Sequence, residues 1–107
     1  KRMLKKKRGS IFFTGATASV KGFSKSSVFA MGKFGLRGLA QSLAKELHPQ
    51  NIHIGHFIID GSIGHENYGS YKVINPDSIA KTYLDFHYQD KSAWSWEIEL
   101  RTSAEKF

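Results

Sequence analysis

Two apolar segments of the chain have the length and composition of buried strands. Residues 10–14 read SIFFT and are followed by Gly15, and residues 52–59 read IHIGHFII. A short apolar run without polar alternation is typical of a strand that is covered on both faces of a parallel sheet. We therefore predict two buried strands of a parallel sheet, with a loop of small and polar residues over 15–26 after the first.

The segment between these runs has the period of a helix. From Ser27 to Leu47, apolar residues recur three and four positions apart, which predicts an amphipathic helix. Ser26 or Ser27 suits its N-cap, and His48-Pro49 ends it, because the residue before a proline avoids the helical conformation. Its buried face is expected to consist of Val28, Met31, Leu36, Leu39, Leu43 and Leu47, widened by Phe29 and Phe34.

A second helix and a third strand are predicted beyond a loop over 60–74. Asn75 suits the N-cap of this helix and Pro76 its first position, and the helix is expected to reach about Tyr88. Its expected apolar side comprises Ile79, Ala80, Tyr83 and Leu84. Residues 96–101, WEIELR, then alternate between apolar and charged, which predicts a strand with one face exposed to water.

The order strand, helix, strand, helix, strand predicts an α/β fold with a parallel sheet between two layers of helices. A chain of 107 residues has room for one domain. Three strands are few for a parallel sheet covered on both faces. The chain also begins at Lys1, with its first methionine at Met3. We therefore expect residues 1–107 to be a partial domain, about half of a fold.

The positive charge is concentrated at the N-terminus. The formal net charge is +7, but residues 1–8, KRMLKKKR, hold six of the 16 basic residues, and the rest of the chain carries 10 basic and 9 acidic side chains. The remainder offers no basic face and no platform on which bases would stack, so nucleic-acid binding ranks last among the functions considered. We interpret residues 1–8 as the basic end of a preceding helix, where the C-terminal carbonyls favour cations.

Other patterns argue against several further kinds of site. The chain has no cysteine, which excludes disulfides and thiolate metal sites and suits a cytoplasmic protein. No apolar run approaches the roughly 18 to 20 residues that span a bilayer, so no membrane partner is expected. His53 and His56 lie three apart on a predicted strand and would point to opposite faces. We therefore expect no metal site.

Small residues follow the first two predicted strands, and these are the candidate site. Residues 14–19 read TGATAS, and residues 60–63 read DGSI. In an open α/β sheet, ligands bind where the strands end and the loops begin. Small residues there would let a ligand approach the backbone, but they also suit ordinary tight turns, and spacing alone favours the turns.

Four segments carry a resemblance to a known family: GSIFFTGATAS, FAMGKFGLRGLAQSLAKEL, NIHIGHFIIDGSI and the tail from Asn75 that contains SAWSWEIELR. Together they cover most of the chain and are similar to the C-terminal half of short-chain dehydrogenases/reductases, here an atypical, uncharacterised branch. The resemblance implies a Rossmann-type fold, NAD or NADP as cofactor, and interconversion of an alcohol and a carbonyl. The family's Gly-rich turn for the cofactor pyrophosphate does not occur in these 107 residues, so the resemblance places it before Lys1.

The resemblance also implies roles for individual residues. Lys33, in FAMGK, stands where the family's lysine binds the nicotinamide ribose; without the resemblance it would be a solvated helix lysine. Phe29 stands at the position of the catalytic tyrosine and Ala16 at that of the serine, and neither has a proton to exchange. The other residues implied near the substrate are Thr17 and Ser19, and those near the cofactor are Thr14, Gly15, Asp60, Gly61 and Ile63, with Asp60-Gly61 in place of a Pro-Gly pair.

Two functions therefore remain open. The first is an NAD(P)-linked oxidoreductase of small alcohols or carbonyls, in which this chain alone is an inactive part and in which Tyr68 or Tyr71 is a possible substitute phenol. The second is a catalytically degenerate relative that keeps the fold for assembly. Glycines recur every third residue at 32, 35 and 38 in the long helix. They would allow either close packing on the helix's own sheet or, as the resemblance implies, a homo-oligomer through residues 27–47.

Overall fold

The computed structural model describes residues 1–16, 27–64 and 73–103, with the backbone alone for residues 27–29. The predicted order of strands and helices is confirmed, and the long helix has the predicted bounds. The elements are α1 (Arg2–Lys6), β1 (Ser10–Ala16), α2 (Ser27–Leu47), β2 (His53–Asp60), α3 (Pro76–His87) and β3 (Glu97–Arg101), with short 3-10 helices over His48–Gln50 and Lys91–Ala93.

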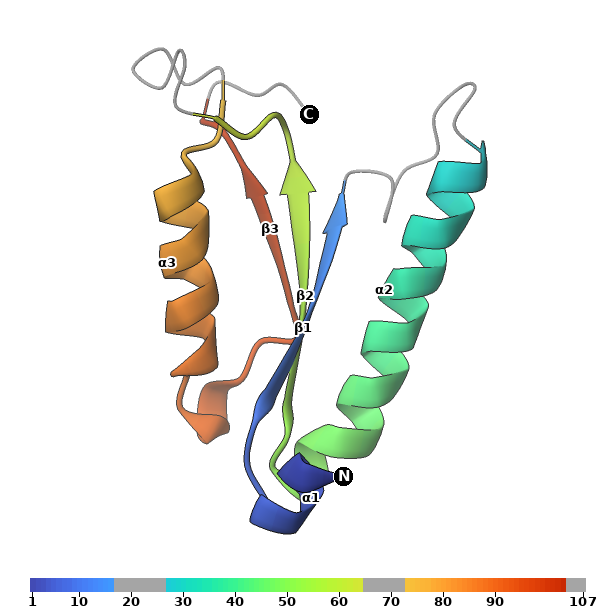
Figure 1. Cartoon of the computed structure of the whole chain (residues 1–107), viewed down its shortest axis with the longest axis vertical. Coiled ribbons are helices and arrows are strands. Elements are labelled where there is room, and N and C mark those ends of the chain that lie inside the picture. The colour runs from blue at the N-terminus through green and yellow to red at the C-terminus, as the bar shows by residue number, and fades with distance from the viewer. Residues whose placement is uncertain (17–26, 65–72, 104–107) are drawn as a thin grey trace.

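The three strands form one parallel sheet in the order β1-β2-β3. Helices α2 and α3 cover opposite faces of this sheet, which gives the predicted three-layer α/β arrangement (Figure 1). All eight residues of the central strand β2 are buried. This position explains why residues 52–59 show no polar alternation in the sequence.

Each face of the sheet has its own apolar cluster. Between α2 and the sheet, the buried members are Ala40, Ala44, Ile52 and Ile54. Between α3 and the sheet, they are Phe57, Ile59, Ile74 and Phe86. Gly55 permits the second cluster, because a Cβ at position 55 would lie 2.6 Å from Cε1 of Phe86. The glycine in the middle of β2 therefore lets this aromatic ring lie directly against the strand.

The predicted buried face of α2 is wrong in part. Leu43 and Leu47 pack against the core as expected, but Met31, Phe34 and Leu39 are 70%, 44% and 49% exposed. The residues that α2 buries are instead Ala30, Ala40 and Ala44. Small alanines let the helix backbone approach the sheet, and Val28 and Phe29 lie outside the described side chains.

The glycines of α2 do not pack on the sheet of this chain. A Cβ added at Gly32, Gly35 or Gly38 would meet no atom within 4 Å among the described residues. The sequence left two explanations for these glycines. The described structure contradicts the first, close packing of the glycines against the helix's own sheet.

Helix α3 begins as predicted but turns a different side to the core. The Asn75 side chain caps the helix by accepting a 2.9 Å hydrogen bond from the Asp77 N–H. Ile79 and Tyr83 pack against the core, whereas Leu84 is 57% exposed and Ala80 is also exposed. Phe86, which the sequence pattern missed, is the buried anchor of the helix because it fills the space above Gly55.

The charged side of β3 is not simply exposed to water, which corrects a further prediction. Helix α2 covers this side, and the Glu97 side chain is 19% exposed. Its carboxylate accepts hydrogen bonds from Arg37 Nε at 2.8 Å and Nη2 at 3.2 Å, and lies 3.1 Å from His56 Nδ1. Glu99, two residues further on, is exposed.

His53 and His56 point to opposite faces of the sheet, as predicted. His53 is stacked between Phe86 and Trp94 on the α3 side, with ring centroids 4.3 Å from each, and His56 contacts Glu97 on the α2 side. Among the described residues, no three His, Cys, Asp or Glu side chains come close enough together to hold a metal ion. No helix in the described part of the chain is both long and apolar enough to cross a membrane.

Candidate functional site

The candidate residues that follow β1 and β2 lie at one edge of the sheet. Because all three strands are parallel, their carboxyl ends meet at the same edge, where α2 also begins (Figure 1). Ala16 pairs with Ile59 in the register, and Asp60 pairs with Arg101. The fold therefore brings residues 14–16 and 60–61 together although they are more than 40 positions apart in the chain.

Lys33 reaches this edge from α2. Its half-buried side chain donates a hydrogen bond from Nζ to the backbone carbonyl of Thr14, at 3.4 Å. Lys33 lies one helical turn from buried Ala30 and so belongs to the sheet-facing side of α2. The ammonium group is thus held beside the end of β1 and not left as a freely solvated helix lysine.

A hydroxyl pair lies near the end of β1 on the other face of the sheet. Thr14 Oγ1 and the Tyr83 hydroxyl are 2.6 Å apart, and the Tyr83 ring is stacked on Phe57 with centroids 3.7 Å apart. The helical period predicts for Tyr83 only a place on the apolar side of its helix. A signal was available, since a tyrosine packed under a strand end usually finds a partner for its hydroxyl.

Asp60, the last residue of β2, is 9% exposed and forms an ion pair with Arg101, with Oδ2 and Nη1 3.3 Å apart. Arg101 also contacts the carboxylate of Glu99. The alternation of residues 96–101 places Arg101 on the exposed face of a strand and does not mark it as a site residue. It could have been found from topology, because the last residues of two neighbouring parallel strands come to the same edge.

The backbone after β2 requires a glycine. Gly61 has a φ of +149°, and a Cβ there would lie 3.3 Å from Cδ1 of Ile74. Beyond it, Ile74 donates to the Ser62 carbonyl at 2.7 Å and accepts from the Gly64 N–H at 3.1 Å. These bonds hold Ile63 in an isolated bridge with Ile74, with its side chain 55% exposed beside the sheet edge.

Several candidate residues fall outside the described part of the chain. These are Thr17, Ser19, Tyr68, Tyr71 and the side chain of Phe29. Ala16 is described, at the end of β1, and brings only a methyl group to the edge. The structure thus brings together Thr14, Gly15, Ala16, Lys33, Asp60 and Gly61.

Comparison with known proteins gives a consistent result. Residues 1–61 match the family model described as short chain dehydrogenase. The (-)-trans-carveol dehydrogenase of Rhodococcus erythropolis is 34% identical over 80 residues, which are 73% of this chain and 29% of that enzyme. The crystal structure of a short-chain dehydrogenase from Rhodopseudomonas palustris is 46% identical with a TM-score of 0.79, over 92% of this chain and 41% of that one.

A more distant structure has the same fold. A serine dehydrogenase complexed with NADP+ superposes with a TM-score of 0.79 at 14% identity, over 98% of this chain and 48% of that one. The chain thus spans less than half the length of each of these three proteins. The sheet and the helices on its two faces form a Rossmann-like α/β arrangement, as predicted. The chain belongs to the short-chain dehydrogenase family of oxidoreductases.

Proposed function

We propose that this chain forms the nicotinamide end of the cofactor site in an NAD(P)-linked oxidoreductase that interconverts an alcohol and a carbonyl. The contact between Lys33 Nζ and the Thr14 carbonyl is the observation that supports this proposal. It holds an ammonium donor at the edge where parallel α/β sheets bind their ligands. Because the chain spans less than half the length of these relatives, we propose that the activity belongs to a longer protein.

The described residues fit one end of such a cofactor better than the other. Lys33 offers a charged donor for ribose hydroxyls, and Gly15 and Gly61 present backbone without side chains at the same edge. No Gly-rich turn for a pyrophosphate occurs in the sequence. A bound nicotinamide cofactor would supply or accept a hydride, while Lys33 would orient it and residues 14–16 and 60–63 would border it.

The site lacks the two side chains that the family uses for proton transfer. Phe29 and Ala16 have no ionisable proton and stand where the family's tyrosine and serine would be. Loss of a general acid typically lowers the rate by about 10² to 10⁴. We therefore propose that the 107-residue chain alone is inactive, and that Tyr68 or Tyr71 is the candidate phenol in the longer protein.

A fluorescence titration of NADPH and NADH into the full-length protein tests this proposal. Lys33→Ala is expected to weaken cofactor binding by about tenfold, since it removes a charged hydrogen-bond donor. Lys45→Ala, an exposed lysine in the last turn of the same helix, is the matched control and should leave the affinity unchanged. Absence of saturable binding of both cofactors, or equal losses in the two variants, would contradict the proposal.

The second candidate function is assembly by a catalytically degenerate relative. Exposed Met31, Phe34 and Leu39 and the three open glycines favour it, because they give α2 an outer surface that is apolar and easily approached. We propose that this surface joins two copies of the chain as a homo-oligomer. Turnover of any alcohol or carbonyl by the unaltered protein would refute degeneracy without affecting the oligomer.

Sedimentation velocity tests the oligomer directly. Leu39→Lys places a charge on the outer face of α2 without touching the sheet and is expected to shift the protein to smaller species. Leu84→Lys is the control, because Leu84 is exposed to a similar extent on α3. A monomer before substitution, or dissociation by Leu84→Lys alone, would refute an interface on α2.

A further inference from the structure

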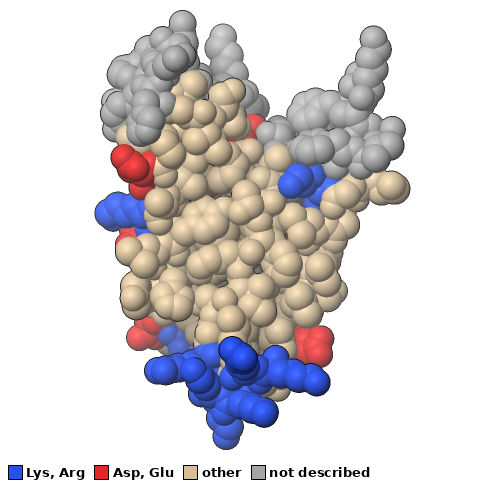
Figure 2. Space-filling view, in the orientation of Figure 1, with Lys and Arg blue, Asp and Glu red and all other residues tan. Residues whose placement is uncertain are grey.

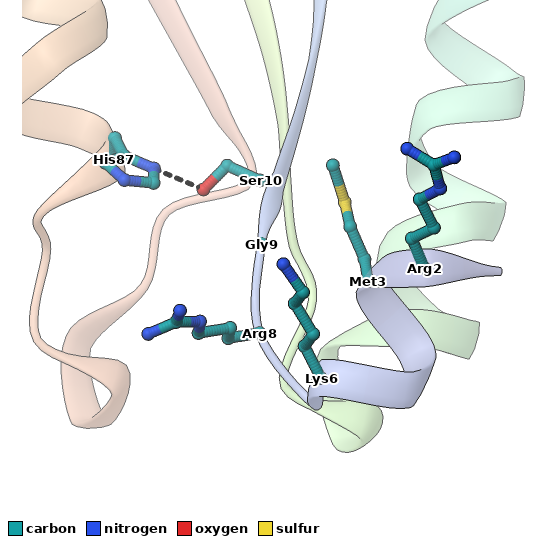
Figure 3. A pocket seen from close by; sticks show the side chains of 7 residues that line it. All are labelled: Arg2, Met3, Lys6, Arg8, Gly9, Ser10 and His87. Carbon is teal, nitrogen blue, oxygen red and sulfur yellow. Dashed lines mark hydrogen bonds between the residues drawn. The ribbon is translucent and has the colours of Figure 1, made fainter.

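The basic side chains of residues 1–8 gather at the end of the molecule opposite the candidate cofactor site (Figure 2). A hollow of about 480 Å³ opens there between α1, the start of β1 and the end of α3. Figure 3 shows the residues that line it, which are Arg2, Met3, Lys6, Arg8, Gly9, Ser10 and His87. Its size is within the usual range for sites that bind small molecules.

We propose that this hollow binds a small phosphate-bearing anion with at least two phosphate groups. Among the residues that the structure describes, three cationic side chains line it and no acidic one does. Within the described part of the chain, Arg2, Lys6 and Arg8 take part in no ion pair. Three uncompensated cations around one hollow attract an anion, and guanidinium groups match the geometry of phosphate oxygens.

The arrangement of the cations indicates the size of the ligand. Arg2 and Arg8 lie on opposite sides of Lys6, and the Ser10–His87 pair stands on the Arg8 side (Figure 3). A ligand with more than one phosphate group would present charged oxygens to more of these side chains than a single phosphate would. A diphosphate offers charged oxygens at both ends, so that Lys6 would bind between them.

The floor of the hollow is held by backbone contacts. Gly9 has a φ of +145°, and a Cβ there would lie 2.6 Å from Sδ of Met3. The Gly9 carbonyl accepts from the His53 N–H at 2.9 Å, and the Lys7 carbonyl accepts from the Asn51 side chain at 2.5 Å. The turn that carries Arg8 is therefore attached to β2 and its neighbouring turn, and the glycine at position 9 leaves room for the Met3 side chain.

The polar wall is suited to binding and not to catalysis. Ser10 Oγ and His87 Nδ1 share a hydrogen bond of 2.7 Å that joins β1 to the end of α3. A serine with a histidine resembles part of a hydrolytic triad, but no carboxylate from residues 1–16, 27–64 or 73–103 lines this hollow to orient the imidazole. One of the two protons of this pair is used in the bond between Ser10 and His87, so the pair offers a phosphate oxygen one donor, either the Ser10 hydroxyl or the His87 Nε2–H.

The helix ends set a requirement on the ligand. Both α1 and α3 end beside the hollow, and the partial negative charge of their last carbonyls opposes an anion. The Lys6 side chain, which lies in the last turn of α1 and lines the hollow, offsets this effect. Because the helix ends cancel part of the attraction of the three cations, a singly charged carboxylate would bind weakly. A phosphate ligand with several negative charges would bind more tightly.

Titration of inorganic pyrophosphate into the protein, followed by calorimetry and by the NMR signals of the His87 ring, tests this proposal. Saturable binding is expected, with movement of the His87 signals. Replacing Lys6 and Arg8 together by alanine should weaken it by at least about tenfold, because two charge-assisted contacts are lost. Replacing Lys1 and Lys5 together by alanine removes the same charge from the same cluster, but neither residue lines the hollow, so the loss should stay under about threefold.

Three results would overturn the proposal. The first is no saturable binding of pyrophosphate up to about 1 mM. The second is equal weakening by the two double variants, which would indicate a diffuse basic surface. The third is tighter binding of a single-stranded oligonucleotide that depends equally on all four side chains, which would indicate a nucleic-acid surface. Thermal unfolding of each variant would confirm that it is folded, and the experiment does not depend on a nicotinamide cofactor.

Discussion

Removing the carboxylate of Glu97 should destabilise the protein far more than its place on a short edge strand suggests. Glu97 accepts two hydrogen bonds from Arg37 and lies 3.1 Å from Nδ1 of His56, whose side chain is fully buried. The neutral variant Glu97→Gln keeps the size of the side chain but loses the charge. It leaves the guanidinium without its partner and offers the imidazole a weaker contact.

The magnitude follows from the burial of the three groups. Breaking a buried ion pair from one side costs about 3–5 kcal/mol, but Arg37 is 39% exposed and water can replace part of what it loses. The hydrogen bonds to a charged group are worth about 1.5–3 kcal/mol each at full burial. With the solvent discount, we expect the free energy of unfolding to fall by about 2 kcal/mol, or about 10 °C in the melting temperature of a chain this size.

Urea unfolding followed by circular dichroism measures this change, and Asp85→Asn is the control. Asp85 forms an ion pair of 3.0 Å with Lys81, but both side chains are mostly exposed, at 65% and 77%. Its loss should cost no more than about 0.5 kcal/mol. If Glu97→Gln lowers stability no more than Asp85→Asn does, the contacts of Glu97 contribute nothing net and the reasoning is refuted.

Three further predictions concern other parts of the fold. Burial lowers the pKa of His53, and His48 and His87 lower it further, while the hydrogen bond to the Ser95 carbonyl raises it. The unfolded chain therefore binds a proton more readily than the folded one, and stability should fall as the pH drops below about 6.5. His53→Phe should make the melting temperature depend less on pH between pH 7 and pH 5. Gly9→Ala should lower the free energy of unfolding by about 1–3 kcal/mol because Gly9 has a φ of +145° and a Cβ there would meet Met3. Gly38→Ala should raise it by up to about 1 kcal/mol, because a Cβ at position 38 of α2 meets no described atom within 4 Å. Chemical denaturation that finds the Gly38 variant less stable than the Gly9 variant would contradict both expectations. Asn75→Ala should cost about 1 kcal/mol by removing the cap of α3, and Asn75→Asp should restore it in the same assay.

The elements of this fold could be predicted because local sequence determines them. The run IHIGHFII has no polar alternation since β2 is covered on both faces, and Asn75-Pro76 marks the start of α3 through capping and the fixed φ of proline. Neither inference needs a distant contact. The parallel topology then places the strand ends together, which is why the Thr14–Gly15 and Asp60–Gly61 segments could be expected at one edge.

The facing of the helices could not be predicted in the same way. The hydrophobic stripe of α3 includes Leu84, but Phe86 faces the sheet because Gly55 leaves room for its ring. Gly55 lies 31 positions before Phe86 in the chain, so the hydrophobic period of the helix alone does not predict that Phe86 is buried. The ion pair between Asp60 and Arg101 likewise depends on the register of β2 and β3 and not on either strand alone.

Helix α2 is the clearest case in which the hydrophobic pattern does not predict which residues are buried. Its sheet-facing side combines alanines with Lys33 and Arg37, whose polar ends contact the Thr14 carbonyl and the Glu97 carboxylate. Met31, Phe34 and Leu39 are exposed, whereas Leu43 and Leu47 in the last turns pack against the core. The rule that the apolar stripe faces the core therefore holds for the end of α2 and fails for these three residues. Each outer side chain that a partner covered would add about 25 cal/mol per Å² of apolar surface removed from water. The sequence of α2 is therefore consistent with a helix covered on two sides. Its own sheet covers the alanines, the two charged residues and the last leucines, and another surface would cover Met31, Phe34 and Leu39.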